Sequence, residues 1–137
     1  IFQNYNLLNY LNAYDNVLTA ISISDPKRKI SKEMLDEYLN TFGIDKTKAN
    51  RKVNKLSGGE QQRVAIARAI ACNGEIILAD EPTGNLDYDT SLAIMKLFRQ
   101  LVDDYGKTVI MVTHNKELAE MTDTIIHIDQ RNKNIYE

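Results

Sequence analysis

The chain has 137 residues, of which 43% are hydrophobic and 26% charged, a composition typical of one soluble domain with a hydrophobic core. Its net charge of −2 gives no support for a nucleic-acid-binding surface, so no nucleic-acid partner is expected. The longest apolar runs are far shorter than the ~18 residues that a membrane helix needs, and the single cysteine, Cys72, allows no internal disulfide.

Helices are predicted through the first half of the chain. The opening "IFQN" is typical of the end of a strand, and a short helix is expected near residues 14–20. Apolar residues at helical spacing predict a second helix between an N-cap at Ser31 and a stop at Gly43. The basic stretch at residues 46–55 is more typical of a solvated loop than of a phosphate- or lipid-binding patch.

The pattern changes in the second half of the chain. A helix from Ser57 to about Cys72 is predicted to complete a helical subdomain over residues 1–72, and residues 73–137 then alternate strands with helices. Strands are predicted at 76–79, 108–112 and 124–128, helices at 90–105 and 116–121, and a short return strand at 130–137. This alternation favours a mostly parallel sheet, and the unbroken apolar runs predict strands buried on both faces.

The start of the helix after Leu56 is a candidate anion site made of Ser57, Gly58, Gly59 and Glu60. Ser57 and Glu60 have the spacing of a capping box, which an ordinary helix start also uses. Each glycine costs ~1 kcal/mol relative to alanine inside a helix, and together they leave the first N–H groups open to a phosphate. The double glycine therefore favours anion binding over a simple cap.

The strand at residues 76–79 leads into Asp80 and Glu81, at the edge where parallel sheets bind ligands. Because successive residues of a strand face opposite sides, the two acids are expected to have different roles. Asp80 suits Mg²⁺, which prefers oxygen ligands, and Glu81 suits orienting or deprotonating an attacking water. A pair of acids in a strand-end turn before Pro82 explains the same residues equally well.

His114 follows the strand at residues 108–112 and is expected at the same edge of the sheet. Its imidazole could donate a hydrogen bond to a terminal phosphate, although a histidine at a strand end more often has a structural role. The sequence "GKT" at residues 106–108 is not a phosphate loop, because the pattern G-x-x-x-x-G-K-[ST] would need glycine where Leu101 stands. The residues thus indicate nucleotide chemistry without the loop that normally holds the phosphates.

Five motifs, taken together, resemble those of the ATP-binding subunit of ABC transporters. "IFQN" is similar to the family's Q-loop, "LSGGE" to its signature, with glutamate where glutamine is usual, and "IILADE" to its Walker B strand with the catalytic glutamate. "GNLD" resembles the D-loop, and "VTHN" resembles the segment that carries the switch histidine. The stretch "DEPTGNLD" is most similar to the macrolide-export and lipoprotein-release ATPases.

The resemblance implies an α/β fold: the C-terminal half of a P-loop NTPase-like (RecA-like) parallel-sheet core, with an α-helical subdomain. In this family the phosphate loop and the aromatic residue that stacks on adenine precede the Q-loop, so the chain is expected to be a fragment that lacks both. The strand of the phosphate loop would lie between the strands at 108–112 and 124–128. Its loss would leave unpaired edges that invite self-association.

The resemblance also implies a mechanism with ATP and Mg²⁺, in which two such domains pair head to tail and enclose the nucleotide between them. Glu81 and His114 would be the catalytic residues, and Asp80 and Gln3 the metal ligands. The signature residues would act on the ATP that the neighbouring subunit holds. Nucleotide contacts are expected from Gln3, Ser57, Gly58, Gly59, Glu60 and Asp87.

The helical subdomain would dock against transmembrane permease subunits, which implies a cytoplasmic protein on the inner face of the membrane. One alternative is an ABC ATPase of translation or DNA repair, although the D-loop "GNLD" and the short interval at residues 4–55 are unlike those groups. Another alternative is a truncated interaction module that binds no nucleotide.

Overall fold

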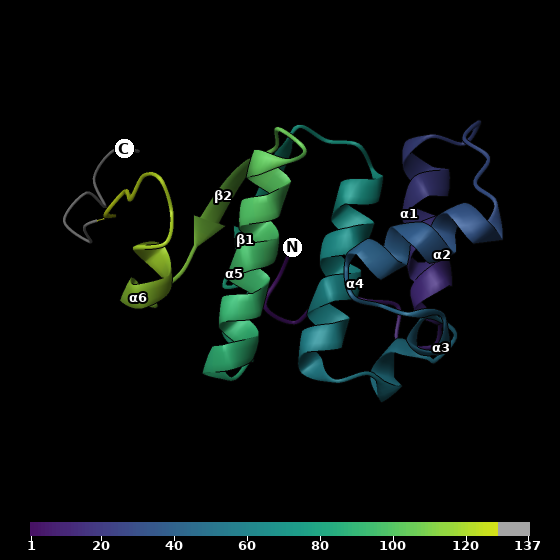
Figure 1. The fold of residues 1–137 in the computed structure, drawn as a ribbon, viewed down its shortest axis with the longest axis horizontal. Helices are drawn as coiled ribbons and strands as arrows, with labels where there is room; N and C mark the ends of the chain where they lie inside the picture. The colour runs from purple at the N-terminus through teal and green to yellow at the C-terminus, as the bar shows by residue number, and fades with distance from the viewer. Residues whose placement is uncertain (129–137) are drawn as a thin grey trace, which may run out of the picture.

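The computed structural model describes residues 1–128 of the chain. Figure 1 shows the N-terminal helices on one side of α4, with α5 and the sheet on the other. Among these residues we find no helix with the length and apolar surface that a bilayer crossing demands. The elements are α1 (Ala13–Ser24), α2 (Lys32–Thr41), α3 (Lys46–Ala49), the 3-10 helix η1 (Val53–Lys55), α4 (Gly58–Ala71), β1 (Ile76–Asp80), α5 (Tyr88–Asp103), β2 (Thr108–Val112) and α6 (Lys116–Ala119).

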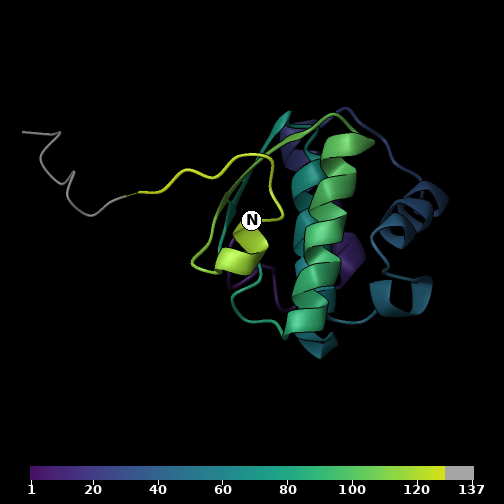
Figure 2. The same cartoon turned by 60° about the vertical axis from the view of Figure 1, so that its left-hand side comes forward.

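β1 and β2 form a two-stranded parallel sheet in which Leu78 lies opposite Ile110. The connection between the strands is α5, and Figure 2 shows this helix running along the sheet in front of α4. Phe2 extends the sheet by an isolated parallel bridge to Asp80, as expected for the end of a strand. The predicted parallel sheet and the mixed α/β architecture are therefore confirmed for the described residues.

Side-chain caps fix the starts of the longer helices. Ser31 and Ser57 each accept a hydrogen bond from the backbone N–H three residues later, which starts α2 and α4 where the sequence predicts. Asp87 caps α5 in the same way, so this helix begins at Tyr88, earlier than predicted. The first helix is longer than the predicted 14–20, because Asn12 caps it at the front and it continues to Ser24.

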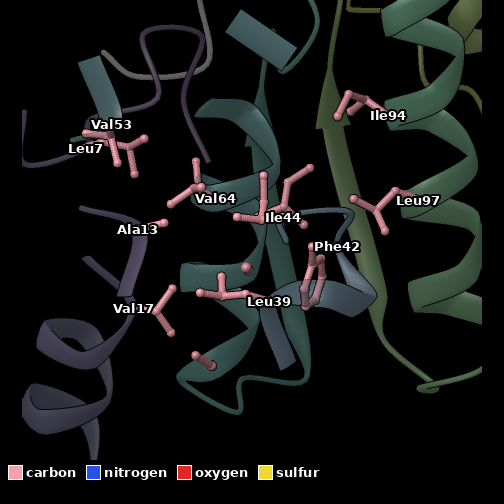
Figure 3. Close-up of a cluster of buried hydrophobic side chains, with 14 of the residues drawn as sticks. Leu7, Ala13, Val17, Leu39, Phe42, Ile44, Val53, Val64, Ile94 and Leu97 are labelled. Carbon is pink, nitrogen blue, oxygen red and sulfur yellow. The ribbon is translucent and has the colours of Figure 1, made fainter. Parts of the chain in front are cut away.

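One hydrophobic core joins the N-terminal helices to α5 through α4. Figure 3 shows Ala13 and Val17 of α1 in one cluster with Leu39 of α2 and Val64 of α4, and all four side chains are fully buried. The cluster continues to Leu118 in α6. Since buried side chains connect the two regions, the proposed division into residues 1–72 and 73–137 stays a prediction.

The prediction that the strands are buried on both faces is wrong for this structure. Ile77 and Ala79 are buried, whereas Leu78 and Ile110 are 64% and 53% exposed. The reason is that α5 packs against one face of the sheet, and within residues 1–128 no element covers the other. We call this uncovered surface the open sheet face; its residues are Ile76, Leu78, Ile110 and Val112.

The predicted strand at residues 124–128 is also wrong. In the described part of the chain the sheet consists of β1 and β2 alone, and Ile126 and Ile128 are 82% and 87% exposed. A strand needs a neighbour for its N–H and C=O groups, and within residues 1–128 no strand pairs with this segment. The predicted return strand at 130–137 lies outside the described residues.

The basic stretch at residues 46–55 is partly helical rather than the predicted loop. Asp45 caps α3, and the fully buried side chains of Ala49 and Val53 anchor α3 and η1 to the core. The lysines of this stretch remain on the outside, where Lys48 pairs with a carboxylate of α4. Near the other end of the described chain, α6 stops before the predicted residue 121.

We expect the chain to self-associate in solution through the open sheet face. A contiguous apolar surface beside an unpaired sheet edge is a common site of protein association. Leu78→Lys should reduce the mass measured by light scattering, because it places a charge in the middle of this face. Met34→Lys, at a position in α2 that is 58% exposed, is the matched control and should leave the measured mass unchanged. A monomeric unmodified chain at tens of micromolar would contradict this expectation.

Candidate functional site

The residues that the sequence singles out gather at one end of the molecule. β1 and β2 run parallel, so their carboxyl ends bring Asp80, Glu81 and His114 to one edge of the sheet. Figure 1 shows that α4 and α5 both begin at this end. Ser57 and Asp87, which cap these two helices, therefore lie on the same side of the molecule as the strand ends.

Glu81 and His114 form a direct pair between the two strand ends. Oε1 of Glu81 accepts a hydrogen bond from the backbone N–H of His114 at 2.9 Å and lies 2.8 Å from its Nδ1. The hydroxyl of Thr113 donates to Oε2 at 3.3 Å. Glu81 has a φ of +43°, so the backbone leaves the strand geometry at this residue. These contacts hold a carboxylate that is 21% exposed beside an imidazole that is 81% exposed.

Asp80, the last residue of β1, is not among the hydrogen-bond or ion-pair partners of Glu81 and His114. It lies opposite Val112 in the sheet register, its side chain is exposed, and no partner of its carboxylate is found among residues 1–128. A free carboxylate at this edge fits a hard cation. The described residues contain no cluster of three acidic, histidine or cysteine side chains, so water or phosphate oxygens would have to complete the coordination.

Gln3 lies beside the loop between β1 and α5. Its Nε2 donates to Oδ1 of Asn85 at 3.2 Å, and Nδ2 of Asn85 donates to the carbonyl of Gln3 at 3.1 Å. A Cβ at Gly84 would lie 2.8 Å from Nε2 of Gln3, so glycine makes room for the carboxamide. The bridge between Phe2 and Asp80 brings the backbone next to Gln3 alongside Asp80. The structure thus places the two predicted metal ligands in neighbouring segments.

The signature residues form the predicted capping box. The N–H of Glu60 donates to Oγ of Ser57 at 3.3 Å, and the N–H of Ser57 donates to Oε2 of Glu60 at 2.9 Å. Nζ of Lys48 lies 3.2 Å from the other carboxylate oxygen. The N–H of Ser57, with a smaller contribution from Lys48, holds the pKa of Glu60 below its usual value. Glu60 is therefore engaged at the helix start, whereas Ser57 is exposed.

Both glycines of the signature lie in close contact with side chains of the same chain. A Cβ at Gly58 would lie 2.9 Å from the hydroxyl oxygen of Tyr5, and a Cβ at Gly59 would lie 2.5 Å from Cγ2 of Thr90. The sequence suggested that these glycines leave space for a phosphate, and the structure adds a second reason for them. Their contact with a phosphate stays a prediction.

Asp87 and the signature meet at the same threonine. Asp87 accepts hydrogen bonds from the backbone N–H of Thr90 at 2.9 Å and from its hydroxyl at 2.6 Å. The hydroxyl of Thr90 is the main cause of a lowered pKa of Asp87. Because the methyl group of this threonine faces Gly59, the D-loop and the signature are neighbours within one chain.

Gly59→Ala is expected to destabilise the chain by ~1–3 kcal/mol, the usual cost of overpacking a tight contact. Thr90 cannot rotate its methyl group away without losing the hydroxyl bond to Asp87. Urea denaturation measures the change. Thr90→Ser removes the methyl group and keeps the hydroxyl. In the Gly59→Ala background it should therefore recover most of the lost free energy of unfolding. Gly74→Ala, where the nearest atom to a new Cβ is 3.6 Å away, is the control.

Three supporting residues are not indicated by the sequence reasoning: Thr113, Asn85 and Thr90. Each contacts a predicted site residue from another segment or from the next helical turn. The only signal in the sequence is their position beside those residues, in "VTHN", in "GNLD" and at the start of α5. Their contacts need the folded chain, because Thr113 and Asn85 reach partners that are distant in sequence.

The sequence matches the family described as "ABC transporter" over residues 1–84. The uncharacterized ABC transporter ATP-binding protein YclH of Bacillus subtilis is 46% identical over 95% of this chain and 58% of its own length. The lipoprotein-releasing system ATP-binding protein LolD of Francisella tularensis is 43% identical over 93% of this chain and 55% of its own length. The macrolide export protein MacB of Aggregatibacter actinomycetemcomitans is 48% identical over 93% of this chain and 20% of its own length.

Two solved structures of the ABC transporter cassette MJ0796 have the same fold. One, described as dimeric, is 44% identical with a TM-score of 0.73 and is matched over 88% of this chain and 54% of its own length. The other, described as a dimeric post-hydrolysis state bound to ADP and Pi, is 43% identical with a TM-score of 0.73 over the same shares. The predicted P-loop NTPase fold and the likeness to macrolide-export and lipoprotein-release ATPases are confirmed. The chain belongs to the ABC transporter family, and it spans about half the length of these ATP-binding relatives.

Proposed function

We propose that this chain supplies the catalytic carboxylate and the signature of an ATPase that powers an ABC transporter. Proteins of this family hydrolyse ATP, and one solved relative is described with ADP and Pi. The observation that carries the proposal is the carboxylate of Glu81. It is held by His114 at the carboxyl end of β1, directly after Asp80, whose carboxylate has no hydrogen-bond or ion-pair partner among residues 1–128.

Within this proposal the two acids have separate tasks. Glu81 orients the attacking water and accepts its proton, because its carboxylate is fixed by His114 and Thr113 at a position close to the strand end. In its doubly protonated form, the exposed imidazole of His114 would donate from Nδ1 to Glu81 and from Nε2 to the terminal phosphate. Asp80 and Gln3 would hold Mg²⁺, which neutralises charge on the phosphates when it is bound.

The second part of the proposal concerns a partner subunit. Ser57 is exposed and precedes Gly58 and Gly59, whose N–H groups lie in the first turn of α4 and could bind a phosphate. Together with Glu60 and Asp87, they would contact ATP that the other subunit of a head-to-tail dimer holds. The description of MJ0796 as dimeric supports this arrangement.

Membrane attachment is proposed through permease subunits that dock on the helical region. MacB is named as an ATP-binding and permease protein, which supports a permease partner for this chain as well. Such docking would place the protein at the inner face of the membrane.

The activity can be measured in a chimera in which this chain replaces the matching segment of the MJ0796 cassette; we call it the MJ0796 chimera. Ser57→Arg and Asp80→Asn subunits should each be inactive alone. A 1:1 mixture of the two variants should regain roughly a quarter of the unmodified activity, because half of the dimers are mixed and each mixed dimer has one of its two composite sites intact. Subunit exchange is verified by two affinity tags. Mixed dimers without activity, despite proven exchange, would contradict action of the signature on the neighbouring subunit.

A further inference from the structure

The guanidinium of Arg68, in α4, donates hydrogen bonds to the backbone of the segment that follows Gln3. Its Nη1 donates to the carbonyl of Asn6 at 2.6 Å, and its Nη2 donates to the carbonyl of Tyr5 at 3.0 Å. The side chain is partly buried, and no carboxylate pairs with it within residues 1–128. A guanidinium with two donors in a fixed geometry suits two neighbouring carbonyls, which lysine could not bind in the same way.

The backbone that Arg68 holds is strained. Tyr5 and Asn6 have φ values of +59° and +48°, in the left-handed region that residues other than glycine rarely adopt. The turn is closed by hydrogen bonds from the N–H of Tyr5 to the carbonyl of Phe2 and from the N–H of Asn6 to that of Asn4. Such a conformation persists only when surrounding contacts maintain it, and the two bonds from Arg68 are contacts of this kind.

The other end of the same segment is tied to the site. Asn85, in the loop between β1 and α5, donates to the carbonyl of Gln3 at 3.1 Å and to Oδ1 of Asn4 at 3.5 Å. Residues 3–6 therefore connect the loop after Glu81 to the middle of α4. The start of that helix touches the same segment, where Gly58 faces the hydroxyl of Tyr5.

We propose that Arg68 is a positioning residue that sets the place of the Gln3 carboxamide through the turn at Tyr5 and Asn6. The inference rests on the proposed function, in which Gln3 is a ligand of the metal bound with ATP. Arg68 itself touches neither Gln3 nor the carboxylates of the site. Its loss lets the turn relax, and Gln3 then loses its fixed position relative to Asp80.

Hydrogen exchange on the chain itself tests whether Arg68 maintains the turn at Tyr5 and Asn6, and it needs no ATP. The peptide that contains residues 3–7 should exchange about tenfold faster in Arg68→Met, and by an intermediate factor in Arg68→Lys, which keeps a cationic donor but not the planar fork that reaches both carbonyls. Arg63→Met is the matched control, because Arg63 lies on the same helix and donates to the carbonyl of Phe42 instead. If Arg68→Met unfolds throughout, as judged by exchange in α5, Arg68→Lys decides. Unchanged exchange at residues 3–7 in the folded variant overturns the inference.

The dependence of ATP turnover on Mg²⁺ in the MJ0796 chimera tests whether Arg68 positions the Gln3 carboxamide for the metal. Arg68→Met should raise the Mg²⁺ concentration for half-maximal turnover about tenfold, the usual effect of losing a residue that orients a metal ligand. Gln3→Ala should give a similar shift, and the double variant should shift no further, because both changes act through one carboxamide. Independent, additive shifts overturn the inference. A chimera that hydrolyses no ATP would instead refute the proposed function, while the exchange result still decides whether Arg68 holds the turn.

Discussion

Replacing Glu81 by glutamine in the MJ0796 chimera is expected to lower ATP turnover about 100-fold or more, while ATP still binds. Glutamine keeps the shape of the side chain and can still accept the N–H of His114, so the strand end should retain its geometry. It removes the charge that accepts a proton from the attacking water. Turnover is followed by phosphate release, and binding by calorimetric titration.

Glu120→Gln is the matched control for this experiment. Glu120 follows α6, is exposed and lies outside the strand-end site, so its neutralisation should leave turnover within about twofold. Near-normal turnover in the Glu81→Gln variant would remove Glu81 from its proposed role. A loss of ATP binding together with turnover would indicate a disrupted site rather than a missing proton acceptor.

The isolated chain is expected to bind Mg-ATP with a dissociation constant above about 1 mM. Its sequence contains no G-x-x-x-x-G-K-[ST] pattern, so neither the lysine nor the backbone N–H groups of a phosphate loop are supplied. The groups at the strand ends and the helix cap include Asp80, Glu81 and Asp87, whose negative charges repel a polyanion. Mg²⁺ would offset only part of that repulsion.

Calorimetric titration of the isolated chain with Mg-ATP measures this dissociation constant. The control is the MJ0796 chimera, which does contain a phosphate loop. Saturation of the chimera and no saturation of the chain is the expected pair of results. A dissociation constant in the low micromolar range for the chain would contradict the expectation, because the described residues would then bind the phosphates unaided.

Features that depend on neighbouring residues could be predicted from the sequence. The starts of α2 and α4 follow from Ser31 and Ser57, and the reciprocal bonds between Ser57 and Glu60 follow from their spacing. β1 and β2 follow from short apolar runs between helices. The start of α5 differs from the predicted residue 90, because the side chain of Asp87 caps the helix and it begins at Tyr88.

Features that depend on distant partners could not be predicted in this way. The apolar run at residues 124–128 has the composition of a strand, but pairing requires a neighbour that residues 1–128 do not provide. The exposure of Leu78 has the same origin, since burial of a sheet face depends on what covers it. Composition indicates which residues can form a strand, and the rest of the fold decides whether they do.

The candidate site shows the same division. That Glu81 and His114 share one edge follows from parallel strands, and their direct contact at 2.8 Å extends that prediction. The hydrogen bonds from Arg68 to the carbonyls of residues 5 and 6 could not be predicted, because they join segments far apart in sequence. The only sequence signal for it was a charged residue that interrupts the apolar stretch of α4.

The most direct measurement of the central claim is phosphate release by the MJ0796 chimera with this chain unmodified. If the chain supplies a working catalytic carboxylate and signature, the chimera should hydrolyse ATP within about tenfold of the parent cassette, a difference of ~1.4 kcal/mol in activation free energy. A folded chimera that binds ATP but releases phosphate no faster than its Glu81→Gln variant would contradict the claim.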